Sequence, residues 1–131
     1  MPNFGQKSSD NLSTAHPDLQ LLFKAVVRDF DCSVLCGHRS EQEQNEVFQV
    51  GKSKVQFPES KHNQFPSMAV DVAPYPINWE NLKRFYFFGG YVKKTAELLG
   101  IKIRWGGDWD SDTLTDDQKF MDLPHFELIQ D

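Results

Sequence analysis

The sequences SKHNQFPSMAVD, residues 60–71, and MDLPHFEL, residues 121–128, decide the fold of this chain. The first supplies His62 and Asp71, and the second supplies His125. Two imidazoles and one carboxylate are a ligand set for a catalytic zinc ion that keeps its fourth position open for water. The sequence therefore predicts a fold that brings these two distant stretches together.

A second carboxylate, Asp122, lies three residues before His125, close enough to reach a water molecule at such a metal without binding the metal itself. Other interpretations fit the same spacing. A histidine and aspartate pair is often a surface or capping feature, and His125, between Pro124 and Phe126, also fits a buried core histidine. Glu127 alternates with His125 and is either a partner of that ligand or simply exposed. The residues alone therefore predict a candidate metal site and no more.

The totals indicate one domain over residues 1–131. A chain of 131 residues with 39% hydrophobic residues is large enough for one core and small for two. A net charge of −5 and a pI of about 5.3 indicate no basic surface for nucleic acid. No run of about 18 apolar residues predicts membrane insertion, and the first residues lack the features of a signal peptide. We therefore expect a protein made in a cytoplasm.

Hydrophobic periodicity predicts an α+β fold. Three helices are predicted, over residues 16–30, 41–50 and 79–99. Four short strands are predicted, over residues 33–36, 69–72, 101–104 and 125–129. The polar residues 1–13 predict a loosely held arm. This order of elements predicts a small, mainly antiparallel sheet with the helices packed to one side.

Side chains alternate between the two faces of a strand, and this alternation makes a prediction for the strand 69–72. Val70 and Val72 should face one way, and Ala69 and Asp71 the other. An apolar face on one side would hold the Asp71 carboxylate toward a cleft on the other. In the helix 79–99, the adjacent pair of glycines at 89 and 90 costs helix stability and indicates a kink or close packing.

The two cysteines, Cys32 and Cys36, are more often free thiols than a disulfide in a chain with no export signal. Together with His38 they form a Cys-x-x-x-Cys-x-His sequence that could be imagined as a metal cluster. This spacing matches none of the common zinc modules, so we do not expect a metal there.

Acidic residues gather in one loop, at Asp108, Asp110, Asp112, Asp116 and Asp117. The alternation of the first three resembles the start of a calcium loop. The sixth position is Thr113 where an EF-hand has glycine, and the twelfth is Lys119 where it has glutamate. A solvated acidic loop is the favoured interpretation, and Ca²⁺ bound by the first three aspartates is the alternative.

Three motifs together resemble the M15 family of zinc peptidases: SKHNQFPSMAVDVAPYP at 60–76, WGGDWD at 105–110 and DLPHFEL at 122–128. The resemblance is to its phage-endolysin branch, the L-alanyl-D-glutamate peptidases that act on the bacterial cell wall. HPDLQLLF at 16–23 and GHRSEQEQNEVF at 37–48 fit the same pattern, so the resemblance covers nearly the whole chain.

The resemblance implies that His62, Asp71 and His125 bind zinc, and that Asp122 is the general base. It also implies that Arg39, in the Gly-x-Arg-Ser element, holds the polarised carbonyl oxygen of the scissile bond. A surface ion pair with a neighbouring glutamate is the alternative for this arginine. The sequence departs from the common pattern in one respect, because His62 and Asp71 are nine residues apart and the family's usual spacing is shorter.

By this resemblance we expect a monomeric, zinc-dependent peptidoglycan endopeptidase that cuts between L-Ala and D-Glu of the stem peptide. It would be a phage endolysin that accumulates in the host bacterial cytoplasm and lyses the cell. Two alternatives stay open. One is a D-alanyl-D-alanine carboxypeptidase or dipeptidase of the same fold. The other is a non-catalytic module that binds zinc or cell wall.

Overall fold

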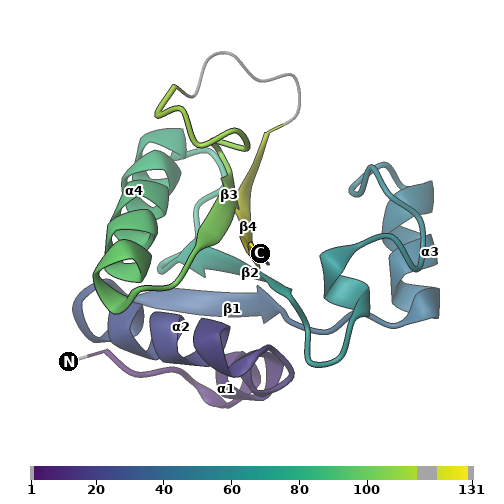
Figure 1. The fold of residues 1–131 in the computed structure, drawn as a ribbon, viewed down its shortest axis with the longest axis horizontal. Helices are drawn as coiled ribbons and strands as arrows, with labels where there is room; N and C mark the ends of the chain where they lie inside the picture. Colours follow the sequence, from purple (N-terminus) through teal and green to yellow (C-terminus); the bar gives the residue numbers. More distant parts are fainter. Residues whose placement is uncertain (1, 115–120, 130–131) are drawn as a thin grey trace.

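A four-stranded sheet lies at the centre of the computed structural model, which describes residues 2–114 and 121–129 (Figure 1). Its strands are β1 (Cys32–Cys36), β2 (Ala69–Pro74), β3 (Ile103–Gly106) and β4 (Asp122–Leu128). They lie in the order β1-β2-β4-β3, and all three neighbouring pairs are antiparallel. The predicted α+β fold with a small antiparallel sheet is confirmed.

The helices of the described chain are α1 (Gln6–Ser13), α2 (Pro17–Asp29), α3 (Glu41–Gln49) and α4 (Leu82–Leu99), with a short 3₁₀ turn, η1 (Lys61–Asn63). Helices α2 and α4 pack against each other, and α4 also packs on β2, β3 and β4. Helix α3 stands at the opposite end of the molecule from α4 (Figure 1). No helix among the described residues is both long and apolar enough to cross a membrane.

The prediction of a loose arm over residues 1–13 is wrong, because the chain forms helix α1 from Gln6 onward. Leu12 is buried in the core, and two polar side chains of the same helix bind the edge strand β1. The Asn11 amide donates to the Val34 carbonyl oxygen at 2.8 Å, and the Ser8 hydroxyl accepts from the Val34 N–H at 3.0 Å. The polar side chains of this segment instead form hydrogen bonds with backbone groups at the open edge of the sheet.

Helix α4 begins three residues later than predicted. The Asn81 side chain accepts a hydrogen bond from the Arg84 N–H at 3.3 Å and so caps the helix at Leu82. At the other end the helix stops where predicted, because Gly100 adopts a left-handed conformation with φ of 75°.

The hydrophobic core and the polar side chains of β2 and β4 lie on opposite faces of the sheet. Val70 and Phe126, which pair across the two strands, both belong to the core on the helix side. The Phe126 ring contacts Phe23 of α2 edge to face, with 5.4 Å between ring centroids. Asp71 and His125, the next pair along, are not part of that core. The predicted alternation along β2 is confirmed.

The two glycines of α4 differ in their surroundings, which gives a matched test of the packing. A Cβ added at Gly89 would overlap the Trp105 indole, which is buried and donates to the Leu123 carbonyl oxygen at 2.8 Å. A Cβ added at Gly90 would meet no atom within 4 Å.

We expect Gly89→Ala to lower the free energy of unfolding by about 1–3 kcal/mol, because the fixed indole cannot move aside. Gly90→Ala should raise it by up to about 1 kcal/mol through helix propensity. Urea unfolding of both variants measures the difference, and equal effects would contradict the packing described.

Candidate metal centre and active site

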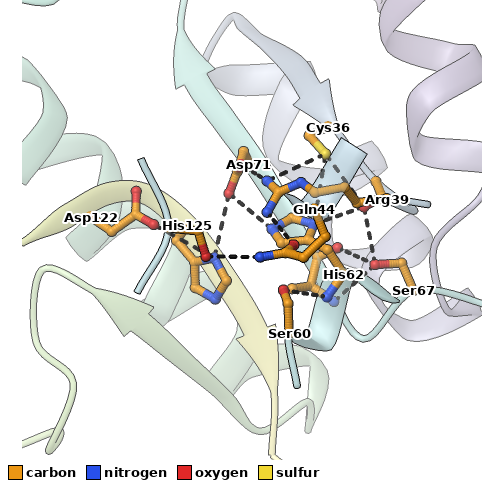
Figure 2. A network of polar contacts seen from close by, with 12 residues as sticks. Cys36, Arg39, Gln44, Ser60, His62, Ser67, Asp71, Asp122 and His125 are labelled. Atoms are coloured by element: carbon orange, nitrogen blue, oxygen red, sulfur yellow. Dashed lines mark hydrogen bonds and ion pairs between the residues drawn. The ribbon is translucent and has the colours of Figure 1, made fainter. Parts of the chain in front are cut away.

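Asp71 lies between the two histidines that the sequence predicts as metal ligands (Figure 2). Strands β2 and β4 pair so that Asp71 stands opposite His125. The Asp71 Oδ1 atom lies 3.4 Å from His125 Nδ1 and 3.2 Å from His62 Nε2. One ligand atom from each of the three residues falls within 4.8 Å of the others. The fold therefore brings together the residues expected to hold a metal ion.

Each histidine has its other ring nitrogen bound by a hydrogen-bond acceptor. His62 Nδ1 lies 2.7 Å from the Gly37 carbonyl oxygen, and His125 Nε2 lies 2.8 Å from Glu127 Oε1. Both acceptors require a protonated nitrogen on the outer side, which leaves the inner nitrogen of a neutral ring as a metal ligand. Two imidazole nitrogens and a carboxylate, oriented in this way, fit a divalent metal ion.

The turn that carries His62 is fixed by local hydrogen bonds. The Ser60 hydroxyl accepts from the His62 N–H at 3.2 Å, and the Arg39 N–H donates to the His62 carbonyl oxygen at 2.7 Å. The long connection from His62 to Asp71 runs out to solvent at Phe65, whose side chain is exposed. Because the additional residues extend away from the site, the nine-residue spacing still leaves the His62 and Asp71 side chains in contact.

His62, Asp71 and His125 shift one another's pKa values. Burial favours the neutral form of His62, but the adjacent Asp71 carboxylate outweighs burial and raises the pKa of His62. Burial alone would raise the pKa of Asp71, but His62 and His125 hold it well below its usual range. Burial lowers the pKa of His125, and the hydrogen bonds of its ring more than reverse this. In the metal-free protein, protons therefore occupy the site that a metal would take.

Asp122 differs from Asp71, because its pKa is raised and not lowered. Burial raises its pKa, and the nearby Asp71 carboxylate raises it further. Its Oδ2 atom lies 3.9 Å from His125 Nδ1, so it stands beside the ligand set (Figure 2). A carboxylate with a raised pKa in this position is suited to accept and return a proton.

Arg39 points into the site. Its Nη2 lies 3.4 Å from Asp71 Oδ2, and its Nη1 donates to Gln44 Oε1 at 2.9 Å (Figure 2). The guanidinium is mostly buried between these two groups. This position differs from a surface ion pair with a neighbouring glutamate, and the role that the resemblance implies for Arg39 stays a prediction.

Gln44 is a residue of the site that sequence reasoning missed. Most side chains of helix α3 are exposed or half-buried, yet Gln44 is fully buried. Its amide nitrogen donates to Ser53 Oγ at 2.9 Å and to the Val55 carbonyl oxygen at 2.7 Å. The only signal in the sequence is that Gln44 shares a helix face with Val47 and Phe48, at the third and fourth positions beyond it.

A cleft of about 960 Å³ opens over these groups. The cleft is lined by the charged and titratable residues described above, Arg39, His62, Asp71, Asp122 and His125. Its walls include Trp79, Trp109 and the loop of residues 51–55. The Trp109 ring lies 5.3 Å from the His125 ring, between centroids, so this aromatic side chain lies against one of the expected metal ligands.

Cys32 and Cys36 are both free thiols, as predicted. Cys32 is buried in the core, and Cys36 lines the cleft with its Sγ 3.8 Å from His62 Nδ1. Within the described part of the chain, neither cysteine is in a group that could hold a metal ion.

The aspartates at 108, 110 and 112 lie close enough to share an ion, within 4.8 Å of one another. Asp108 also accepts the Thr113 N–H at 2.9 Å and lies 3.8 Å from Lys93 Nζ, so the loop has an internal anchor. Asp116, Asp117 and Lys119, at the later positions compared with an EF-hand, lie outside the described residues. Calcium binding here stays a prediction.

Comparison with known proteins identifies the family. Residues 2–129 match the model of the phage L-alanyl-D-glutamate peptidase family. The chain belongs to this family. The L-alanyl-D-glutamate peptidase of Escherichia phage T5 is 29% identical over 113 residues, which cover 82% of each chain. The crystal structure of the Serratia marcescens L-Ala D-Glu endopeptidase ChiX has a similar fold, with a TM-score of 0.75 and 30% identity over 98% of this chain and 91% of that one. The peptidase family expected from the motifs is confirmed.

In this phage peptidase, Gln44 should contribute strongly to stability. Gln44→Leu removes the buried hydrogen bond that Arg39 Nη1 donates to Gln44 Oε1 and the one that the Val55 carbonyl oxygen accepts from the Gln44 amide. We expect it to lower the free energy of unfolding by about 1–3 kcal/mol. Gln42→Leu, on the exposed side of the same helix, is the matched control and should change it little. Chemical denaturation measures both, and an equal effect of the two would contradict the buried role.

The protons held by the two histidines predict that metal binding depends on pH. Their pKa values are raised, so the metal-free site is protonated near neutral pH and must release protons when a metal binds. The apparent zinc affinity should therefore rise by roughly tenfold or more per pH unit between about pH 6 and pH 8. Competition with a chromophoric chelator measures it. An affinity that stays constant over this range would show that the rings are already neutral.

Proposed function

We propose that this protein is a zinc-dependent endopeptidase that hydrolyses the L-alanyl-D-glutamate bond in the stem peptides of bacterial peptidoglycan. One observation carries the proposal. The ligand set His62, Asp71 and His125 shares a cleft with Asp122 and Arg39 in a member of the phage L-alanyl-D-glutamate peptidase family. Zinc is the metal that most often takes two imidazoles and one carboxylate with a position left for substrate.

Zinc held by these three residues would supply a Lewis acid for the scissile carbonyl and make a water molecule more acidic. Asp122, beside His125 and at the cleft surface, would take the proton of the attacking water. Its raised pKa suits this step, because a carboxylate with a higher pKa is a stronger base toward the proton of water. The same carboxyl would then pass the proton to the leaving amine of D-Glu.

Arg39 would donate hydrogen bonds to the carbonyl oxygen as negative charge develops on it. Gln44 holds one side of the guanidinium and Asp71 the other, so the group is oriented before substrate binds. A pre-oriented donor costs little reorganisation in the transition state, which is where such contacts contribute most to rate.

We extend the proposal to the setting in which the enzyme works. It would act as a monomeric phage endolysin that accumulates in the host cytoplasm and reaches the wall during lysis. Membership of a phage peptidase family supports this setting. Light scattering of the purified protein and fractionation of infected cells test the two points, and a stable dimer or an early appearance in the wall would contradict them.

Digestion of purified peptidoglycan, followed by mass spectrometry of the released fragments, tests the reaction. We expect stem peptides that begin at D-Glu, lost with a zinc chelator and restored by added zinc. Release of D-Ala alone would assign the enzyme to D-alanyl-D-alanine carboxypeptidases. No release by a folded, zinc-loaded sample would favour a binding module.

Substitution of the general base separates an enzyme from a binding module. Asp122→Asn should lower the turnover number by about 100-fold or more, because the amide cannot take the proton. Zinc content should stay at the parent level, since Asp122 is not a ligand. Asp10→Asn, an exposed aspartate of α1, is the matched control. Turnover by Asp122→Asn close to that of the parent would overturn the role given to this residue.

A further inference from the structure

His125 has a charged partner on the side away from the metal position. Its Nε2 atom lies 2.8 Å from Glu127 Oε1, and the Glu127 side chain is buried. Both residues are on β4, two positions apart, so strand alternation places them on the same face of the sheet. The other histidine differs, because His62 has a neutral acceptor, the Gly37 carbonyl oxygen, in the corresponding position.

The second oxygen of the same carboxylate forms ion pairs with two basic side chains. Glu127 Oε2 lies 3.0 Å from Lys61 Nζ and 3.6 Å from Arg104 Nη1. A buried carboxylate is stable only with such partners.

Lys61 links this network to the other half of the site. It directly precedes His62 in η1, and its Nζ also donates to the Leu128 carbonyl oxygen of β4 at 2.9 Å. The ion pair from Lys61 to Glu127 therefore spans the two stretches that carry the metal ligands. Lys61 and Leu128 are 67 positions apart in the sequence.

We propose that Glu127 is a positioning residue of the metal centre, which fixes His125 with Nδ1 toward the metal and, through Lys61, ties the His62 turn to β4. The inference rests on the metal centre of the proposed function and deepens it. A carboxylate acceptor makes the imidazole a stronger donor and selects the tautomer that leaves Nδ1 free for the metal. The carbonyl behind His62 sets the tautomer there without adding charge. Glu127 thus gives the two histidines unequal donor strength.

Zinc affinity tests the inference without reference to catalysis. Glu127→Ala removes both the hydrogen bond and the charge, and we expect the affinity to fall by about 10- to 100-fold, measured by competition with a chromophoric chelator. Glu127→Gln keeps the shape and an acceptor oxygen but not the charge, so it should give a smaller loss. Glu97→Gln, an exposed glutamate of α4, is the matched control and should bind zinc like the parent.

Three further measurements separate positioning from general stability. Circular dichroism of the metal-free variants shows whether they fold, and Glu127→Gln serves if Glu127→Ala does not. The absorption spectrum of the Co²⁺-substituted protein should change in both, because it reports the geometry of the ligands. Lys61→Gln should lower zinc affinity in the same direction, by less than Glu127→Ala.

Each outcome decides the inference. Zinc affinity within about threefold of the parent in folded Glu127→Ala, for which a loss of about tenfold or more is expected, overturns it. If that variant does not fold, parent affinity and an unchanged cobalt spectrum in Glu127→Gln overturn it. Loss of affinity with an altered cobalt spectrum supports it. A parent protein that binds zinc with this dependence on Glu127 but releases nothing from peptidoglycan would leave the inference standing and overturn the proposed function.

Discussion

The register between β2 and β4 is the constraint on which the rest of the structure depends. Val70 opposite Phe126 places Asp71 opposite His125 on the other face. A slip by one residue would turn the apolar pair to solvent and the metal ligands into the core. Burying a side chain such as Phe126 stabilises the fold by about 2–3 kcal/mol, so the hydrophobic effect sets the geometry of a polar site it does not touch.

The three carboxylates of the site have different surroundings. Asp71 lies among two imidazoles and a guanidinium, which keep it ionised and fixed. Asp122 is half-buried beside that negative charge, which raises its affinity for a proton. Glu127 lies against the outer nitrogen of His125 and forms ion pairs with Lys61 and Arg104. The site thus carries three carboxylates to which we assign the roles of ligand, proton carrier and support, and their surroundings and not their chemical type distinguish them.

The sequence predicted the features that repeat with a period or occupy a motif. The apolar stripe of α2, the alternation along β2 and the approach of His62 and His125 to Asp71 were all visible in it. It did not predict α1, the buried position of Gln44 or the two basic residues that pair with Glu127. These depend on hydrogen bonds between segments far apart in the chain, and a polar residue with a distant partner looks the same in sequence as one in water. Periodicity reports burial of apolar surface and is blind to such pairs.

Gln44 connects two parts of the cleft that could otherwise vary separately. Its carbonyl oxygen holds the arginine, and its amide nitrogen holds the loop at Ser53 and Val55 that forms a wall. Insertions or deletions that reshape this wall for a different cell-wall peptide would therefore also disturb the arginine. During evolution, a change of specificity by this route would come with a loss of rate, and adaptation should proceed more freely on the opposite wall, around Trp109.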